Sequence, residues 1–441
     1  LLLKRVIQHL FSAHHSGQIE FYTDASADQL AWATGQRWIN HVSVYRNPAT
    51  AAIFPLLRIA PATFARLFVS TPAPANKSVS EQLSVEIYRH PRDFPDDVQQ
   101  LLQDAERIHI ELGVDWFENL IDQVFPAHPG ISFHVLRRQT LPVALLPILT
   151  TKGSWGVTVG SLSNYYTAIY GLIMRANVSS AELAVLLESL KKTAASASVF
   201  KFYPMDPQAP NYAIFFDALT LTGLRPFNYF CFGNWYLPVK GSWVDYLKDR
   251  KGSVRSTIKR MDKKLSTGGG TLELVTGGPD LEAKLAAYQQ VYAASWKGKE
   301  PYADFVPGLM RRCAERGWLR LGLAWLDGQP IAAQLWIVAN GRANIYKVAY
   351  DEDYKPYAPG TLLTALLMQH VLEQDKVHEV DYLIGDDPYK ETWMSHRRER
   401  WGIVAYNPRT LAGLVGLLRE LAGRALKRIR ARTSPAPIAG H

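Results

Sequence analysis

The residues best suited to chemistry are Pro359, Gly360 and Thr361, which stand directly before an apolar helical pattern over 362–373. The first N–H groups of a helix have no partner inside the helix, and together with the helix dipole they attract anions. Gly360 has no Cβ, so the main chain there can approach a ligand closely. These properties favour a pyrophosphate site and a nucleotide-bearing ligand. The alternative is an ordinary loop that enters a helix.

Two predicted strands must position this helix. Residues 342–350 and 379–384 have strand character, and a strand–helix–strand order makes their pairing parallel. Upstream of the helix, the dipeptides Asp327-Gly328 and Asn340-Gly341 are strong hairpin signals, and they predict a three-stranded antiparallel meander over 319–350. This context favours a binding loop over an ordinary connection.

Composition restricts the class of protein. The chain has 441 residues, of which 47% are apolar, enough for two or three cores. A net charge of +9 favours anionic partners such as phosphorylated cofactors or lipid head groups. The sequence has no nucleic-acid-binding module, so no nucleic acid partner is expected. Cys231 and Cys313 suggest neither a disulfide framework nor a metal site, and they fit a cytoplasmic location. No apolar run is long enough to span a bilayer.

The predicted fold class is α+β, with two tandem units that each contain a mixed, mostly antiparallel sheet flanked by helices. Residues 83–238 form the first unit and residues 240–407 the second. Residues 1–80 have weak periodicity, end in a Pro- and Ser-rich linker and receive no fold. Residues 408–441 are predicted to form a basic amphipathic helix and a tail.

Residues 240–407 resemble the GNAT superfamily of acyl-CoA transferases. Within it they look most like the acetyltransferases linked to cellulose and exopolysaccharide biosynthesis (the CelD type), a branch similar to the Fem-type peptidoglycan aminoacyltransferases. The unit over 83–238 resembles the preceding half of the same branch. The segments that carry the resemblance are Arg255–Arg260, Leu326–Ala333, Ala358–Leu363 and Asp381–Lys390 with Trp393. One departure is that the usual glycine-rich loop is reduced to Gly360.

The resemblance implies that acetyl-CoA or another acyl-CoA lies in a wedge between two splayed parallel strands, 345–350 and 380–384. Its pyrophosphate would sit on N–H groups at the start of the helix, and its pantetheine would pair with the edge of the first strand. The residues expected to bind this co-substrate are Val348, Tyr350, Gly360, Thr361 and Leu362. The implied reaction is acyl transfer to an amine or hydroxyl of a small-molecule or glycan-precursor acceptor for the cell envelope or an exopolysaccharide.

Three residues after the second strand are candidate catalysts. Asp387 could take the proton of the attacking amine or hydroxyl, and Tyr389 could protonate the leaving thiolate. Lys390 could offer charge to the carbonyl oxygen or to a phosphate. In the structural alternative, Asp387 caps a helix whose first residue is Pro388.

Three further residues are candidates for acceptor binding. Arg255 and Arg260 lie on a basic helical stretch over 243–265 and could receive an anionic acceptor or a CoA phosphate. Trp296 could stack on a sugar ring. The alternatives are a solvated basic face for the arginines and ordinary packing for Trp296.

The C-terminal segment over 411–432 has two interpretations. Its apolar stripe could dock on the protein, or the helix could lie on an anionic membrane at the inner face. Two other functions stay open for the whole chain. One is a Fem-like transferase that uses aminoacyl-tRNA, and the other is a non-catalytic scaffold that retains the GNAT fold.

Overall fold

A computed structural model describes residues 83–433, except Trp155 and Gly298, and these residues belong to one compact unit. The expectations for 1–80 and for the tail beyond 433 lie outside the described residues. The strands are β1 (Leu83–Tyr88), β2 (Ile131–Arg138), β3 (Leu141–Gly153), β4 (Gly156–Ser161), β5 (Ile173–Met174), β6 (Ala197–Met205), β7 (Arg225–Pro238), β8 (Thr271–Val275), β9 (Leu319–Leu326), β10 (Gln329–Ala339), β11 (Arg342–Tyr350), β12 (Glu379–Asp381) and β13 (His396–Tyr406).

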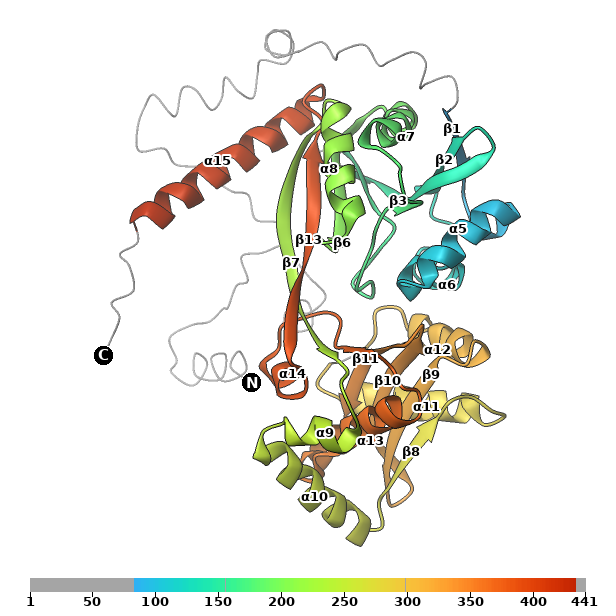
Figure 1. The fold of residues 1–441 in the computed structure, drawn as a ribbon, viewed down its shortest axis with the longest axis vertical. Coiled ribbons are helices and arrows are strands. Elements are labelled where there is room, and N and C mark those ends of the chain that lie inside the picture. The colour runs from blue at the N-terminus through green and yellow to red at the C-terminus, as the bar shows by residue number, and fades with distance from the viewer. Residues whose placement is uncertain (1–82, 155, 298, 434–441) are drawn as a thin grey trace, which may run out of the picture. The chain divides into compact units, whose positions relative to one another are not determined.

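Helices cover these strands (Figure 1). The 3-10 helices are η2 (Pro91–Asp93), η3 (Ile110–Leu112) and η4 (Glu352–Tyr357). The α-helices are α5 (Asp96–Glu106), α6 (Val114–Val124), α7 (Ser180–Thr193), α8 (Pro210–Leu221), α9 (Trp243–Lys248), α10 (Gly252–Thr267), α11 (Leu281–Ala294), α12 (Phe305–Glu315), α13 (Pro359–Glu373), α14 (Pro388–Trp393) and α15 (Leu411–Thr433). The predicted α+β class, with a mixed sheet flanked by helices, is confirmed.

The strands form one continuous mixed sheet in the order β1-β2-β3-β4-β6-β13-β7-β12-β11-β10-β9-β8. Pairing is parallel between β4 and β6 and between β11 and β12, and the other pairs along this order are antiparallel. Each parallel pair is connected through a helix, α7 in the first half and α13 in the second. Each half therefore contains one strand–helix–strand crossover within an otherwise antiparallel sheet.

Strands β7 and β13 join the two halves (Figure 1). Along most of its length β7 pairs with β13, and its last residues, Tyr236–Pro238, pair with β12. Strand β13 comes from the end of the second half, yet it pairs with β6 of the first. The boundary near residue 239 stays a prediction, but strands from both sides cross that region and make the sheet continuous.

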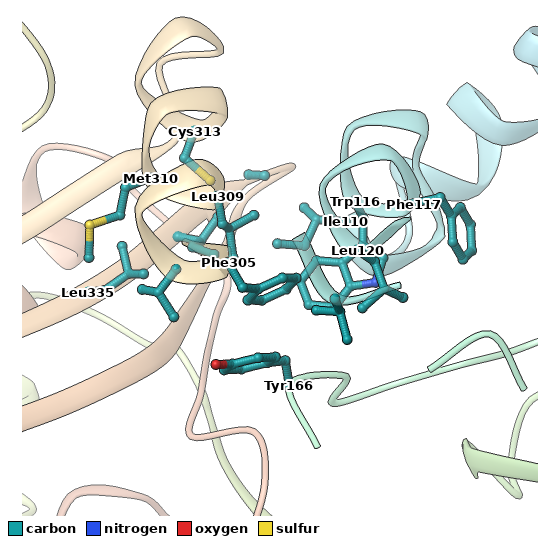
Figure 2. Packing of buried hydrophobic residues seen from close by; sticks show 14 of the residues in the cluster. Ile110, Trp116, Phe117, Leu120, Tyr166, Phe305, Leu309, Met310, Cys313 and Leu335 are labelled. Carbon is teal, nitrogen blue, oxygen red and sulfur yellow. The ribbon is translucent and has the colours of Figure 1, made fainter. Parts of the chain in front are cut away.

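One apolar core also reaches across both halves. Trp116 of α6 packs edge-on against Phe305 of α12, with the ring centroids 5.6 Å apart, and Tyr166 stacks on the same phenylalanine at 4.1 Å. Figure 2 shows α12 side chains facing the Ile110–Leu120 segment. Trp116 and Phe305 are almost fully buried, and burial of side chains of this size contributes roughly 1.5–3 kcal/mol each. The two halves are thus packed through a shared interior.

Two helical predictions differ from the structure. The basic stretch over 243–265 is two helices rather than one, because the chain breaks between α9 and α10. The side chain of Arg255 donates to the carbonyl oxygens of Leu247, Lys248 and Arg250 at 2.9, 3.2 and 2.5 Å. These bonds satisfy the free carbonyl groups at the end of α9, which explains why the break is stable.

Docking of the predicted apolar stripe on the protein is wrong for several of its members. Leu411 and Leu418 are 53% and 46% exposed, and Ala422 and Ala425 are exposed as well. The helix instead approaches the sheet through its glycines: a Cβ on Gly413 would lie 2.8 Å from the carbonyl oxygen of Ser198. Small residues permit this close approach and leave the leucines on the outer face. No helix within 83–433 combines the length and apolarity needed to cross a membrane.

Candidate functional site

The parallel strands β11 and β12 separate soon after they meet. They pair only from Arg342 with Glu379 to Asn344 with Asp381. Strand β12 ends there, while β11 continues to Tyr350 with β10 on its other side. Beyond Asn344, no described strand covers this edge of β11. The expected splay between the two strands is therefore present.

The peptide groups of Val348 and Tyr350 face this uncovered edge. The N–H of Asp351 donates to the carbonyl oxygen of Ile331 at 2.9 Å. Asp351 and Ile331 are therefore a hydrogen-bonded pair that continues the ladder between β11 and β10. In an antiparallel pair, hydrogen-bonded and non-hydrogen-bonded residues alternate. The register then places Val348, opposite Gln334, and Tyr350 in non-hydrogen-bonded pairs, with N–H and C=O directed away from β10. These are the groups that an extended ligand could pair with, as a further strand would.

The first turn of α13 follows η4 at the end of this edge. Its N-cap, Ala358, has left-handed backbone angles (φ 47°, ψ 47°), and Pro359 has no N–H to offer. The N–H groups of Thr361 and Leu362 donate to the Ala358 carbonyl at 3.0 and 3.2 Å. Within the part of the chain that the structure describes, the Gly360 N–H has no partner. Of the three expected donors, one is free and two belong to the first turn of the helix.

A buried glutamine that sequence reasoning missed fixes this turn. Gln334 of β10 is fully buried, and its Nε2 donates to the Gly360 carbonyl at 2.7 Å and to Thr364 Oγ1 at 2.9 Å. Its Oε1 accepts from Trp336 Nε1 at 2.9 Å. A buried amide with all these partners rigidifies its surroundings. The signal in the sequence is a glutamine within the apolar run over 330–339 of β10.

The basic helix α10 approaches the same corner. Lys264 donates to the Pro356 carbonyl at 3.0 Å and lies over the ring of Tyr357, 4.6 Å from its centroid. Arg260 is exposed and has no partner among the described residues. Arg255, by contrast, is occupied with the end of α9. The structure thus leaves Arg260 accessible to an anion and uses Arg255 as a helix cap.

The 384–390 segment is held together by its lysine. The buried Lys390 ammonium donates to the carbonyl groups of Ile384 and Gly385 and lies 3.4 Å from the Asp387 carboxylate. Burial lowers the pKa of this ammonium from its usual value. Asp387 takes the N-cap position of α14, but its side chain makes no capping hydrogen bond. Tyr389 is half-exposed, and loss of hydration together with the Asp387 charge raises its pKa to about 12.

Trp296 packs beside Tyr350, the last residue of β11. Its ring is 4.7 Å from that of Tyr350, and it is 50% exposed. The neighbouring Lys297 lies 5.5 Å above the indole ring. Although Lys297 as a whole residue is exposed, desolvation of its ammonium and then the charge of Lys347 lower its pKa to about 8. This places an aromatic face and an easily titrated cation together.

An ion pair next to Trp296 connects β11, through Glu300, to two tyrosines of the first half. Lys347 lies 2.6 Å from the Glu300 carboxylate, and both side chains are mostly buried. Glu300 also accepts from the hydroxyls of Tyr165 and Tyr166 at 3.0 and 2.7 Å. Hydrogen bonds and the Lys347 charge outweigh burial and lower the pKa of Glu300. Sequence reasoning missed this cluster because its members come from three distant segments.

Comparisons with known proteins come from a family model and from solved structures. Residues 252–391 match the model described as an acetyltransferase (GNAT) domain. The crystal structure of FemX has a TM-score of 0.52 and 11% identity, and the match covers 73% of this chain and 97% of that one. None of the curated proteins matches the sequence significantly.

Two other solved structures give lower scores. A tandem GNAT protein from the clavulanic acid biosynthesis pathway has a TM-score of 0.42 and 16% identity, with 74% of this chain and 99% of that chain covered. The C-terminal domain of a putative lysylphosphatidylglycerol synthetase from Agrobacterium fabrum has a TM-score of 0.43 and 14% identity, with 73% and 95% covered. At these identities, the likeness to FemX concerns the fold alone.

Proposed function

We propose that this chain is a GNAT-type transferase that moves an acyl group from acyl-CoA to an amine or hydroxyl, in line with the match of residues 252–391 to the acetyltransferase (GNAT) domain model. The observation that carries the proposal is the uncovered edge of β11, where the peptide groups of Val348 and Tyr350 lead toward the free N–H of Gly360. An extended pantetheine pairs with such an edge, and a diphosphate is attracted to such a helix start.

The charges around this corner support an anionic donor. Arg260 and Lys264 come from α10, and Lys264 reaches the η4 segment directly before α13. Cations near a helix N-terminus add to its attraction for phosphate. We assign Arg260 to the phosphates of the donor and keep Thr361 and Leu362 as weaker contributors, because their N–H groups are shared with the Ala358 carbonyl.

The acceptor is proposed to enter past Trp296 and Tyr165. Each ring is 50% exposed, and flat exposed aromatic faces suit the stacking of a sugar ring, as in a glycan or cell-envelope precursor. Lys297 stands next to Trp296 and favours an acceptor that carries negative charge. Tyr389, half-exposed on α14, is kept as the group that protonates the leaving thiolate.

Calorimetry with acetyl-CoA tests the donor. The wild type is expected to bind acetyl-CoA. Gly360→Asp is expected to bind it at least about 100-fold more weakly, because the new carboxylate would repel the diphosphate that the Gly360 N–H attracts. Gly360→Ala is the matched control, since a Cβ at this position would lie 3.4 Å from Tyr350 and is accommodated. Failure of the wild type to bind would favour an aminoacyl-tRNA donor or a non-catalytic scaffold.

The outer face of α15 supports a second assignment, namely contact with an anionic membrane surface. Leu411, Leu418, Leu421 and Leu426 are all exposed on this helix. Arg419 is exposed beside them, and the sequence adds four more cations between 427 and 432. Apolar and basic residues together favour binding to anionic lipids. Co-sedimentation with vesicles that contain anionic lipid should decrease for Leu418→Asp, and vesicles of neutral lipid should bind neither protein.

A further inference from the structure

A small, partly enclosed cavity lies where β11 and β12 separate. Its volume is ≈ 10 Å³, which is room for about one water molecule. Polar side chains from both halves line it: His109 and Glu111, Asn234, Asn344, Asp381 and Arg400. Asn344 and Asp381 are the last residues that pair β11 with β12. The cavity therefore marks the closed end of the splay.

The two carboxylates in this cavity differ in their partners. Asp381 accepts from Asn234 Nδ2 at 2.5 Å and from the Leu383 N–H at 2.7 Å, and it pairs with Arg398. These contacts lower the pKa of Asp381 and hold it as an anion. Glu111, which is 3% exposed, accepts a hydrogen bond from its own N–H and has no hydrogen bond to another described residue. Of the two acids, only Glu111 is free to exchange a proton.

The surroundings of Glu111 keep its proton exchangeable near neutral pH. Burial raises the pKa of Glu111 to about 7, and the Asp381 charge adds to the rise. The hydrogen bond from its own N–H and the charges of Arg342 and Arg400 act in the opposite direction. His109 stays neutral, because burial and the arginines lower its pKa to about 3. A carboxyl group whose pKa lies near the working pH suits general base catalysis.

The path of the donor leads toward this cavity. From Tyr350 to Asn344 the edge of β11 spans six residues, or ~20 Å at about 3.3 Å per residue. A bulge at Tyr346 interrupts the ladder between β10 and β11, since Lys347 pairs with Leu335 and Ile345 with Trp336. Bulges redirect peptide groups at active sites. A thioester at the end of the pantetheine would arrive beside this bulge and the cavity.

We propose that Glu111 is the general base of the transfer reaction, acting directly or through a single water in the cavity. As the acceptor nitrogen or oxygen bonds to the acyl carbon, its proton passes to the Glu111 carboxylate. The carbon–sulfur bond then breaks, and the Tyr389 hydroxyl gives its proton to the thiolate, which leaves as the thiol. The proton on Glu111 passes to solvent while Tyr389 takes one up. This assignment rests on the proposed acyl-CoA activity, and it replaces Asp387 as the proton acceptor, because Asp387 is exposed and tied to Lys390.

The test compares Glu111→Gln with Glu106→Gln, a matched control on α5. Glu106 is also buried but pairs with Arg316 at 2.7 Å, away from the cavity. For E111Q we expect kcat to fall by about 10²–10⁴-fold and the acidic limb of the pH–rate profile near pH 7 to disappear, with acetyl-CoA affinity unchanged. E106Q should keep the wild-type rate and limb.

The thermal stability of E111Q shows whether a loss of activity comes from the missing carboxylate or from a damaged fold. Because the pKa of Glu111 is higher in the folded protein, its ionisation destabilises the fold as pH rises through about 7, and E111Q should raise Tm at pH 8. An E111Q enzyme with wild-type rate and an unchanged acidic limb overturns the proposal. If E111Q does not fold, Glu111→Asp is the second variant. A shift in the acidic limb of its pH–rate profile supports the assignment, and an unchanged acidic limb overturns it. Absence of acetyl-CoA binding by the wild type would instead refute the proposed donor.

Discussion

Each half of the sheet contains a strand–helix–strand crossover, but only the crossover of the second half leaves most of a strand edge unpaired. In the first half, β4 pairs with β6 from Val157 to Gly160, which is most of the length of β4. In the second half, β12 pairs with only the first three residues of the nine-residue strand β11. In the first crossover β4 is paired along most of its length, whereas in the second most of β11 has an uncovered edge.

The helix starts differ in the same way. Helix α7 begins with a capping box, in which the Ser179 hydroxyl accepts from the Glu182 N–H and the Glu182 carboxylate accepts from the Ser179 N–H. The protein's own negative charge therefore occupies this N-terminus. Helix α13 has no side-chain cap, and its Gly360 N–H is free within the described chain. The comparison indicates that the first crossover is built for support and the second for binding an anion.

Proline substitutions at neighbouring residues of β11 should produce the largest contrast. Val348→Pro removes an N–H that faces the uncovered edge, so we expect acetyl-CoA affinity to fall about tenfold while the fold is kept. Ala349→Pro removes an N–H that bonds to β10 and should lower the free energy of unfolding by about 3 kcal/mol or more. Urea unfolding and calorimetry check both. A V348P protein as unstable as A349P would contradict the assigned direction of the edge.

Removal of an aromatic face should have the next largest effect. Trp296→Ala takes away the exposed ring beside Tyr350, and we expect the acceptor KM to rise about fivefold, from the loss of roughly 1 kcal/mol of stacking. The KM for acetyl-CoA should change much less. Steady-state kinetics with a saturating donor measures this difference, and equal changes in both KM values would argue against an acceptor site at Trp296.

The pH dependence of acceptor binding should follow Lys297. Its pKa is lowered to about 8, so the ammonium is charged below this pH and neutral above it. An anionic acceptor should therefore bind severalfold more weakly as pH rises from 7 to 9. Lys297→Arg keeps the charge over this range and should remove the dependence. An unchanged slope in the arginine variant would show that another group titrates.

The smallest effect is expected at the closed crossover. Ser179→Ala removes the hydroxyl half of the capping box and should lower the free energy of unfolding by about 1 kcal/mol. Acetyl-CoA affinity should stay the same, because α7 is not assigned to ligand binding. Thermal unfolding and calorimetry on the same preparation measure both quantities. A change in acetyl-CoA affinity would contradict the view that the first crossover only supports the fold.

Much of the second half could be predicted from sequence because its signals are local. Asp327-Gly328 and Asn340-Gly341 adopt positive φ angles, as two-residue hairpin turns require, and β9, β10 and β11 follow the predicted ranges closely. The splay after Asn344 also agrees with the resemblance. Strand and turn chemistry are determined by neighbours in the chain, so one sequence suffices to find them.

The missed features depend on residues that lie far apart in the sequence. Strand β13 pairs with β6 across about 200 residues, and no local pattern in either strand specifies that partner. Glu111 belongs to a short 3-10 helix of the first half, yet it lines a cavity with Asn344 and Asp381 of the second. A lone glutamate near apolar residues carries no sign of such a location. For Arg255 the sequence leaves anion binding and a solvated basic face as alternatives, because the helix break that it caps is not evident from local signals.

Amide hydrogen exchange with and without acetyl-CoA tests the central contrast most directly. The account predicts that acetyl-CoA slows exchange in peptides covering 345–362, which contain the uncovered edge of β11 and the start of α13. Peptides covering 156–182, which contain β4 and the capped start of α7, should exchange at the same rate with and without the ligand. Unchanged exchange over 345–362, or slowing confined to 156–182, would contradict it.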